Sequence, residues 1–468
     1  MQKGFILFFI LLNSIAVSAQ LDAGLSKALP LTSKPSIVQG VNSAVLSLAG
    51  DWDFSISHSR REHKIKVPRE WEMQGFKVNE GETALYKRML SIPEDWRGKR
   101  IILRFEGVSS HAVVKVNGKI VVEHDDGFVP FNTDITDALQ NSNNVLIVEV
   151  QSRTISDILA CTSQYAVHTV GGILRDVVIM AVPEEHITNL SVVTTFDKQY
   201  KTATLSLNYN LSETAVGSIL QYTLRDKQGK IVFQEKTSNP SFQKTRLNVR
   251  QWNPEHPYLY ELTTELLENG KAVQAIKQKI GFRQVEINGA RLFVNGKPVK
   301  LHGVNRHSVH PLTGRSIGAA LDVQDAILFR EANCNFIRTS HYPATEAFLD
   351  ACDSLGLFVE DESSLCWIQH HASPIWKKWD YNDERFLPFM LQANIEKVIA
   401  HRNHPSVIMW SLGNESAWSP LWATVNEAGK QLDPTRPTLF HDQCWGGFNN
   451  YGSKRNLEGS FIEIRYFE

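Results

Sequence analysis

The sequence is poor in cysteine. Its cysteines are scattered, without paired spacing, at Cys161, Cys334, Cys352, Cys366 and Cys444. An odd number with no regular spacing excludes a typical disulfide framework, so we expect buried free thiols.

An excess of charge of one sign is also missing. The chain has 49 Lys and Arg residues against 50 Asp and Glu residues, a formal net charge of -1. Nothing electrostatic therefore favours a nucleic-acid partner or an acidic membrane surface. The G-x-G-x-x-G, P-loop and G-x-S-x-G motifs are absent, so nucleotide binding and serine hydrolysis have no support in the sequence.

Histidines are frequent but lack the spacing of a metal site. Those in the C-terminal half include His302, His307, His310, His341, His370, His371, His401 and His404. No H-x-x-x-H pair on a predicted helix and no Cys/His spacing accompanies them. The sequence therefore predicts no metal ion and no other cofactor.

Long apolar runs are absent beyond the N-terminus. Lys3 precedes an apolar run at residues 5–12, and Ser18 and Ala19 stand before Gln20. A basic residue, a short apolar run and small residues in this order are typical of a cleaved signal peptide. We expect residues 1–19 to be that peptide and the mature chain to be exported to the periplasm or the extracellular space. No later run is long enough to span a bilayer, so no membrane partner is expected.

Two stretches have the alternating pattern of β-strands. In residues 20–183, short alternating segments include 101–108, 111–127 and 144–150, and Asn117-Gly118 has the chemistry of a hairpin turn. This pattern predicts a β-sandwich. In residues 184–285, clean alternation at 203–212 and 218–226 favours an immunoglobulin-like sandwich.

From residue 286 the pattern changes to apolar strands that alternate with amphipathic helices. The strands are expected at 299–304, 335–340, 357–362, 407–415 and 438–442. One helix should end before Gly356, and another should begin at Ser419-Pro420. Repeated strand–helix units predict a (β/α)-barrel with strands buried on both faces.

About five strand–helix units can be recognised where a complete barrel has eight. We therefore expect residues 286–468 to form the N-terminal part of a barrel. Residues 455–468 show no clear helix or strand.

Polar residues stand at the carboxyl ends of four of these strands. They are Asn305, Arg306 and His307; Arg338, Ser340, His341 and Tyr342; Glu360, Asp361 and Glu362; and Asn414 and Glu415. Barrel enzymes build their sites at the carboxyl ends of the strands. Taken alone, Glu415 could equally be a capping or surface carboxylate. Four converging ends predict a pocket for a hydroxyl-rich substrate and acid catalysis.

The sequence around these residues resembles that of glycoside hydrolase family 2. The resemblance is carried by the segments 335–359, 401–416, 302–311, 172–177, 252–260 and 281–287. It implies a jelly-roll sugar-binding domain, an immunoglobulin-like sandwich and a (β/α)8 TIM barrel, with a retaining mechanism on terminal β-linked sugars. Glu415 would be the general acid/base and Asn414 would hold the sugar 2-hydroxyl. His307 and His341 would contact the substrate or the transition state, and Arg338 is a further substrate-binding candidate.

The sequence departs from the family pattern in three places. The family's nucleophile is a Glu on a later barrel strand, and neither Glu458, Glu463 nor Glu468 has the expected flanks, so the nucleophile is unknown. Large β-galactosidases hold magnesium with a Glu and a His where Cys366 and Ile368 stand here. The acidic residue that the first domain lends to the pocket is not evident at residues 164–166.

Our leading hypothesis is an exo-β-glycosidase that removes terminal β-D-galactosyl residues from oligo- or polysaccharides. A β-glucuronidase, or another family-2 β-glycosidase, is the alternative within the class. A truncated, non-catalytic carbohydrate-binding remnant is the alternative outside it. A carbohydrate is the expected partner in each case, and the sequence leaves a homo-oligomer open.

Overall fold

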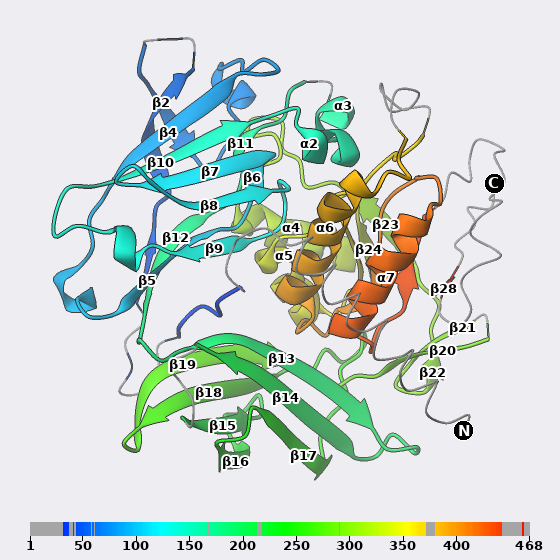
Figure 1. Ribbon diagram of the computed structural model, residues 1–468. Helices are drawn as coiled ribbons and strands as arrows, with labels where there is room; N and C mark the ends of the chain where they lie inside the picture. The colour runs from blue at the N-terminus through cyan, green and yellow to red at the C-terminus, as the bar shows by residue number, and fades with distance from the viewer. Residues whose placement is uncertain are drawn as a thin grey trace, which may run out of the picture.

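The computed structural model describes residues 31–36, 41, 44–57, 59, 61–166, 168–212, 218–289, 291–370, 380–441 and 461–462. The predicted signal peptide and Cys444 lie outside these residues. The chain forms two β regions followed by an α/β region, and Figure 1 shows them at the upper left, the bottom and the right. Among the described residues, no helix has both the length and the apolar character that a bilayer crossing needs.

The first region is an antiparallel β-sandwich. One sheet has the order β3-β2-β4-β10-β7-β8 and the other β1-β12-β5-β9. The first sheet comprises β2 (Gly50–Ile56), β3 (His63–Val67), β4 (Thr83–Leu90), β7 (His111–Val116), β8 (Lys119–Asp125) and β10 (Asn144–Gln151). The second comprises β1 (Val45–Ser47), β5 (Arg100–Phe105), β9 (Phe131–Asp134) and β12 (Val177–Val182). Every second residue of β7 is buried, because one face of the strand packs on the core.

The connections of this region include the predicted hairpin and two short helices. Asn117 and Gly118 both have positive φ, 51° and 82°, as a tight β7–β8 turn requires. The helices α2 (Ile155–Ala160) and α3 (Thr162–Ala166) follow β10, and β6 (Val108–Ser109) pairs with β11 (Gly172–Ile173). Single 3-10 turns occur at η1 (Glu72–Gln74), η2 (Glu94–Trp96) and η3 (Thr136–Ala138).

The second region is the predicted immunoglobulin-like sandwich. Its sheets have the orders β13-β14-β17 and β16-β15-β18-β19. Its strands are β13 (Ile187–Phe196), β14 (Ala203–Leu211), β15 (Ile219–Arg225), β16 (Ile231–Thr237), β17 (Ser241–Leu247), β18 (Tyr260–Glu268) and β19 (Lys271–Ile280). Leu205, Leu207, Tyr222 and Leu262 of the two facing sheets fill the core between them.

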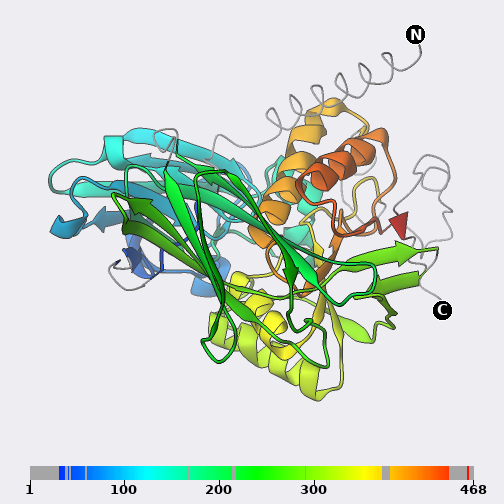
Figure 2. The ribbon, with the colours of Figure 1, turned by 90° about the horizontal axis from the view of Figure 1, so that it is seen from below.

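The third region is a parallel α/β fold. A small antiparallel sheet, β20 (Val285–Asn288), β21 (Arg291–Val294) and β22 (Lys297–Pro298), precedes it. Its parallel strands pair in chain order: β23 (Gly303–Arg306), β24 (Phe336–Thr339), β25 (Phe358–Glu362), β26 (Val407–Ser411), β27 (Thr438–Leu439) and β28 (Phe461–Ile462). The helices are α4 (Ala319–Glu331), α5 (Glu346–Leu355), α6 (Leu387–His401) and α7 (Pro420–Leu432), with a 3-10 turn η4 (Glu384–Phe386) before α6. Figure 2 shows α4 and α5 (yellow-green) apart from α6 and α7 (orange).

Both helix termini predicted from the sequence are found. Helix α5 begins after Thr345, whose side chain accepts a hydrogen bond from the Phe348 amide, and ends at Gly356, where φ is 77°. Helix α7 begins after Ser419 with Pro420 in its first turn. The cysteines Cys161, Cys334, Cys352 and Cys366 are buried free thiols, as expected.

Two strand predictions were wrong. Residues 299–304 were expected to form a strand buried on both faces, yet β23 starts at Gly303 and its first three residues are exposed. Among the described residues β23 pairs only with β24, so one edge and part of its surface stay open. Residues 455–468 were expected to contain no clear strand, yet β28 pairs with β27 in parallel. A strand of two residues is too short to leave a periodic signal.

The first region packs against the carboxyl ends of the parallel strands. Arg175 donates to the carbonyls of Pro343 (2.6 Å) and Ala344 (3.2 Å) just after β24. His124 contacts Glu396 of α6 at 2.8 Å, and Asp126 accepts a hydrogen bond from Ser364 after β25. These contacts bring α2 and α3 over the strand ends, where the predicted site residues lie.

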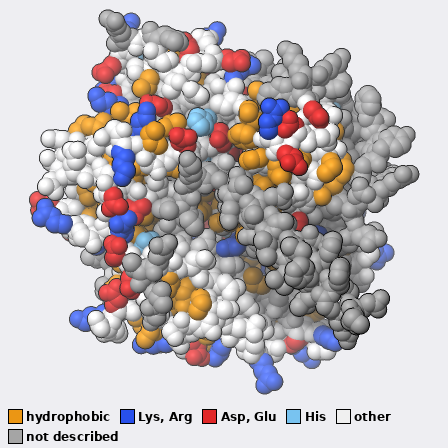
Figure 3. All heavy atoms as spheres, in the orientation of Figure 1, with side chains coloured by type: hydrophobic (Ala, Val, Ile, Leu, Met, Phe, Trp, Pro, Cys, Tyr) orange, Lys and Arg blue, Asp and Glu red, His pale blue; other side chains and the backbone are white. Residues whose placement is uncertain are grey.

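A cavity of about 680 Å³ lies where the three regions meet, and none of the predicted site residues lines it. Lys34 forms ion pairs there with Glu106 of the first region (2.8 Å) and Glu346 of α5 (2.7 Å). On the face drawn in Figure 3, acidic and basic side chains intermingle, as the balanced composition predicts.

Candidate active site

The candidate site begins at the end of β26. This strand is buried throughout, and the chain continues through Gly413 to Asn414 and Glu415. Asn414 is fully buried, whereas Glu415 is partly exposed and has a left-handed φ of 40°. Non-glycine residues in this conformation cost about 1 kcal/mol or more and cluster at functional sites. The turn therefore presents the Glu415 carboxylate to solvent while the amide before it stays inside.

Glu362, at the end of β25, connects three of the predicted residues. Its carboxylate accepts hydrogen bonds from Arg338 (2.6 and 2.9 Å) and His341 (2.7 Å). The Ser411 hydroxyl donates a further bond at 2.7 Å. Arg338 also donates to the Asn414 side-chain oxygen at 2.8 Å. Arg338, His341 and Asn414 are thus fixed relative to one another through a single buried carboxylate.

The charge of Glu362 is stabilised by these neighbours. Burial alone would raise the pKa of the Glu362 carboxyl, but Arg338 and the hydrogen bond from His341 outweigh burial. The pKa is therefore held well below the usual range of a glutamate, and the group stays ionised. A buried ionised group that makes four hydrogen bonds is suited to orienting its neighbours and not to donating a proton.

His307 lies beside this network and not within it. Its ring is 5.1 Å from that of His341, and its side chain is exposed. Desolvation by its neighbours and the nearby His341 and Arg315 lower the pKa of His307 to about 4. His307 is therefore neutral at pH 7 and can exchange hydrogen bonds with a hydroxyl group without carrying charge.

Two aromatic residues at the site were not predicted from the sequence. Trp367, after β25, donates its indole N–H to Glu415 Oε2 at 2.8 Å. Tyr165, from α3 of the first region, stacks on Trp367 with ring centroids 4.3 Å apart. The Tyr165 ring also lies 5.2 Å from His341 and 5.8 Å from His307. The proximity of residues 164–166 to the pocket was anticipated, but nothing in the sequence singled out a tyrosine there.

His441, after β27, is a further buried member that was not predicted. Its Nε2 lies 2.5 Å from Glu360 Oε1, and Arg338 Nε lies 3.6 Å from the same oxygen. Glu360, Glu362 and His441 place ligand-type atoms within 4.8 Å of one another. Arg338 and the direct His441–Glu360 contact already engage the two carboxylates. These contacts account for the close approach of the three side chains.

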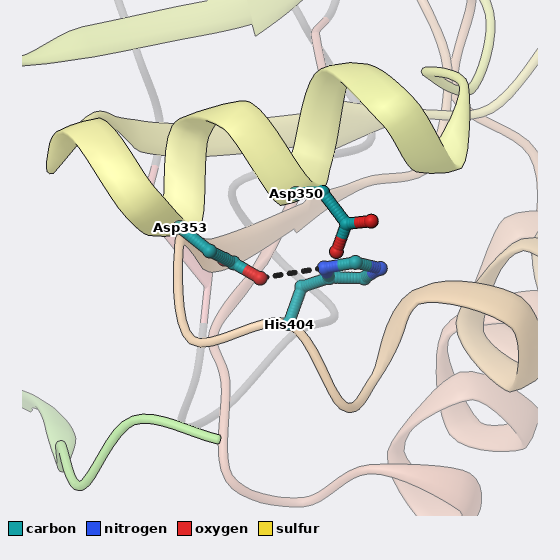
Figure 4. Close-up of side chains that lie close together, drawn as sticks. All are labelled: Asp350, Asp353 and His404. Carbon is teal, nitrogen blue, oxygen red and sulfur yellow. Dashed lines mark hydrogen bonds and ion pairs between the residues drawn. The ribbon is translucent and has the colours of Figure 1, made fainter. Parts of the chain in front are cut away.

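A second group with metal-ligand chemistry lies outside the site. Asp350 and Asp353 of α5 face His404, which follows α6 (Figure 4). His404 Nδ1 lies 2.7 Å from Asp353 Oδ2, and Asp353 also accepts from the Ser406 amide. These contacts tie α5 to the loop before β26, which is a structural role.

The residues near Glu415 do not fit magnesium. Cys366 is buried, and burial raises the pKa of its thiol far above the ordinary value, so the sulfur is neutral. The Asn414 amide donates to that sulfur at 3.3 Å. Ile368 is buried and offers no ligand atom. Because Mg²⁺ prefers oxygen ligands and water, we assign no catalytic step to this metal.

The structure thus brings Arg338, His341 and Asn414 together through Glu362, with His307 beside His341 and Glu415 beside Trp367. Their catalytic and binding roles stay predictions. No nucleophile can be assigned among the described residues. Glu458, Glu463 and Glu468 fall in parts of the chain that the structure does not describe, so their expected exclusion stays untested.

The order of a β-sandwich, an immunoglobulin-like sandwich and a parallel α/β region with carboxylates at its strand ends is typical of glycoside hydrolases. The chain belongs to glycoside hydrolase family 2. The family's sugar-binding domain matches residues 45–183, its second domain 185–283 and its TIM-barrel domain 285–456.

Similar proteins divide between two activities. A β-galactosidase of Thermoanaerobacter pseudethanolicus is 33% identical over 392 residues, which cover 80% of this chain and 50% of the relative. A putative β-glucuronidase of Formosa agariphila is 30% identical, covering 80% of this chain and 47% of the relative. The chain thus spans about half the length of these curated relatives. A solved β-D-glucuronidase from Dictyoglomus thermophilum has a TM-score of 0.73 at 25% identity, covering 88% of this chain and 74% of that structure.

Proposed function

We propose that the chain provides the acid/base part of the active site of a retaining exo-β-glycosidase that acts on terminal β-D-galactosyl residues. The observation that carries the proposal is the position of Glu415. Its carboxylate stands partly exposed at the carboxyl end of a buried barrel strand, next to an asparagine that Arg338 holds in place. A proton donor with this access to a hydroxyl-binding pocket suits glycosidic-bond cleavage.

The neighbouring residues would divide the remaining tasks. Asn414, fixed by Arg338, would donate its amide to a hydroxyl of the sugar. His341, held by Glu362, and the neutral His307 would contact further hydroxyls. A retaining mechanism also needs a second carboxylate about 5–5.5 Å from the first, to form the glycosyl-enzyme intermediate. Glu362 is unsuited to this nucleophilic role because Arg338, His341 and Ser411 already engage its oxygens.

The experiment that tests the proposal is an assay of the chain with methyl β-galactoside, whose leaving group is poor. We expect Glu415→Gln to lower any turnover at least a hundredfold, whereas Glu268→Gln, at an exposed carboxylate in the second region, should leave it unchanged. Equal rates for the two variants would remove Glu415 from the mechanism. Binding of galactose without turnover would support a carbohydrate-binding remnant.

A β-glucuronidase is the second candidate, and the likeness to the solved β-D-glucuronidase of Dictyoglomus thermophilum favours it. Galactose and glucuronic acid differ at C6, where glucuronic acid carries a carboxylate. Aryl β-glucuronides measured beside aryl β-galactosides therefore separate the two. A ratio of kcat/KM above about tenfold in favour of the glucuronide would replace galactose in the proposal.

We also propose that the protein is exported with its first 19 residues removed. The support is the order Lys3, apolar run, Ser18 and Ala19 in the sequence. N-terminal sequencing of the mature protein should begin near Gln20, and a mature protein that begins at Met1 would contradict the export proposal.

A further inference from the structure

We propose that Trp367, held in place by Tyr165 of the sugar-binding domain, positions the acid/base Glu415 through a neutral N–H donor. The inference rests on the proposed role of Glu415. It adds two positioning residues from two different domains, neither of which is assigned by the family resemblance.

The backbone around Trp367 is attached to the Glu415 turn on one side and to the first domain on the other. The Trp367 amide donates to the Asn414 carbonyl at 3.0 Å, and the Ile368 amide donates to the Ser416 hydroxyl at 3.0 Å. The Cys366 amide donates to the Leu159 carbonyl of α2 at 2.8 Å. Trp367 therefore cannot move independently of the turn that carries Glu415.

The Trp367 side chain is equally constrained. Its indole stacks with Tyr165 at 4.3 Å and an interplanar angle of 23°, and with His370 at 6.0 Å and 22°. The Tyr165 side chain also lies near the side chain of Cys366, the residue before Trp367. Tyr165 therefore packs on the Trp367 ring and beside the residue that precedes it.

The chemistry of the indole explains what this arrangement does for Glu415. An indole has one N–H donor and no acceptor. It can therefore donate to one carboxylate oxygen and cannot accept a hydrogen bond from the other. Oε2 receives that bond at 2.8 Å, which leaves Oε1 to carry the transferable proton. A divalent cation in the same place would favour the carboxylate far more strongly than a neutral N–H does. The tryptophan orients the group and still lets it regain a proton in each catalytic cycle.

The geometry can be tested without turnover, by NMR of the chain labelled with ¹⁵N-tryptophan. Trp367→Phe identifies the Trp367 indole signal, and the signals of the other tryptophans serve as internal controls. We expect Glu415→Gln to shift this signal, because the indole N–H then faces a neutral amide in place of the carboxylate that accepts its hydrogen bond. Tyr165→Ala should shift it through the lost ring current, whereas Tyr165→Phe should shift it less. A Trp367 signal that ignores both Glu415→Gln and Tyr165→Ala would overturn the inference.

The effect of the Trp367–Glu415 hydrogen bond on catalysis is measured on the active enzyme. We expect Trp367→Phe, which keeps the stacking ring and removes the N–H, to lower kcat about tenfold for glycosides with poor leaving groups. Activated aryl glycosides and KM should change little, and EDTA should leave the wild-type rate unchanged. An equal loss on both substrate classes, or a loss confined to KM, would refute the positioning role. If the chain binds galactose without turnover, the carbohydrate-binding remnant replaces the proposed function, while the NMR result still decides the geometry.

Discussion

Arg338 and Glu362 form a buried ion pair that joins the end of β24 to the end of β25. Two guanidinium nitrogens, Nη2 and Nε, lie 2.6 and 2.9 Å from Glu362 Oε2, and both side chains are almost fully excluded from solvent. Because the same guanidinium reaches Asn414, this pair determines the positions of residues on three neighbouring strand ends.

Removing Arg338 should therefore destabilise the parallel-sheet region. Arg338→Met leaves the Glu362 carboxylate buried without its main counter-charge, which typically costs about 3–5 kcal/mol. Urea denaturation followed by tryptophan fluorescence measures the change. Arg97→Met, at an exposed arginine, is the control and should change stability by less than about 0.5 kcal/mol.

The same pair should make stability fall in acid. The pKa of Glu362 is lowered in the folded protein, so its contribution is present above the unfolded value of 4.5 and is lost as the pH falls below it. Wild-type stability should decline from about pH 4.5 downward, and Arg338→Met should show a shallower decline. If the stability of the wild type and of Arg338→Met declined with the same slope below pH 4.5, Glu362 would not be the source of the acid sensitivity.

His404 should give the opposite pH dependence. Burial opposes its charge, but Asp353 and the further carboxylates Asp350 and Glu346 raise the pKa of His404 to about 9 from 6.5. A raised pKa stabilises the fold fully below pH 6.5, and the contribution disappears as the pH rises to about 9. We expect a loss on the order of 3 kcal/mol over this range in the wild type.

His404→Gln provides the comparison for that loss, because its amide can still donate to Asp353 but carries no charge. Its stability should be nearly constant between pH 6.5 and 9. Thermal unfolding at half-unit pH steps measures both proteins. A wild-type profile as flat as that of the variant would show that the His404–Asp353 contact contributes no charge-dependent stability.

Glu415→Gln should be most damaging when the leaving group is poor. A glutamine cannot protonate the departing oxygen, and an alkoxide needs that proton far more than a nitrophenolate does. We expect at least a hundredfold loss of kcat with methyl or sugar aglycones in the active enzyme, and a much smaller loss with dinitrophenyl glycosides in the glycosylation step. Equal losses on both would remove the acid/base assignment.

The sequence predicted those parts of the fold and the site that periodicity or strand position can encode. The strand at 407–411 is an unbroken apolar run, and it is buried at every position. The polar residues that follow it could therefore be placed at a strand end from the sequence alone. The same reasoning places Arg338, Glu362 and Asn414 close together, because neighbouring parallel strands end at the same edge of the sheet.

The residues that escaped prediction come from segments without such a pattern. Trp367 lies in the irregular loop after β25, and its position depends on hydrogen bonds to Asn414 and Ser416. Tyr165 reaches the site from another domain, some 200 residues earlier in the chain than Trp367. A contact between two domains depends on how they pack, and one sequence carries no periodic signal for that packing.

The open edge of β23 leads to a final prediction. Val304 is 41% exposed, and among the described residues this strand pairs on one side only, with β24. The edge strand β8 of the first region carries the charged residues Lys119, Glu123 and Asp125, which discourage pairing with another chain. The only charged residue of strand β23 is Arg306, which is buried.

We therefore expect the 468-residue chain to self-associate through β23 as its concentration rises. Val304→Lys should lower the weight-average mass in sedimentation velocity, whereas Ile120→Lys on β8 should not. Equal effects of the two substitutions, or none from either, would contradict self-association through β23.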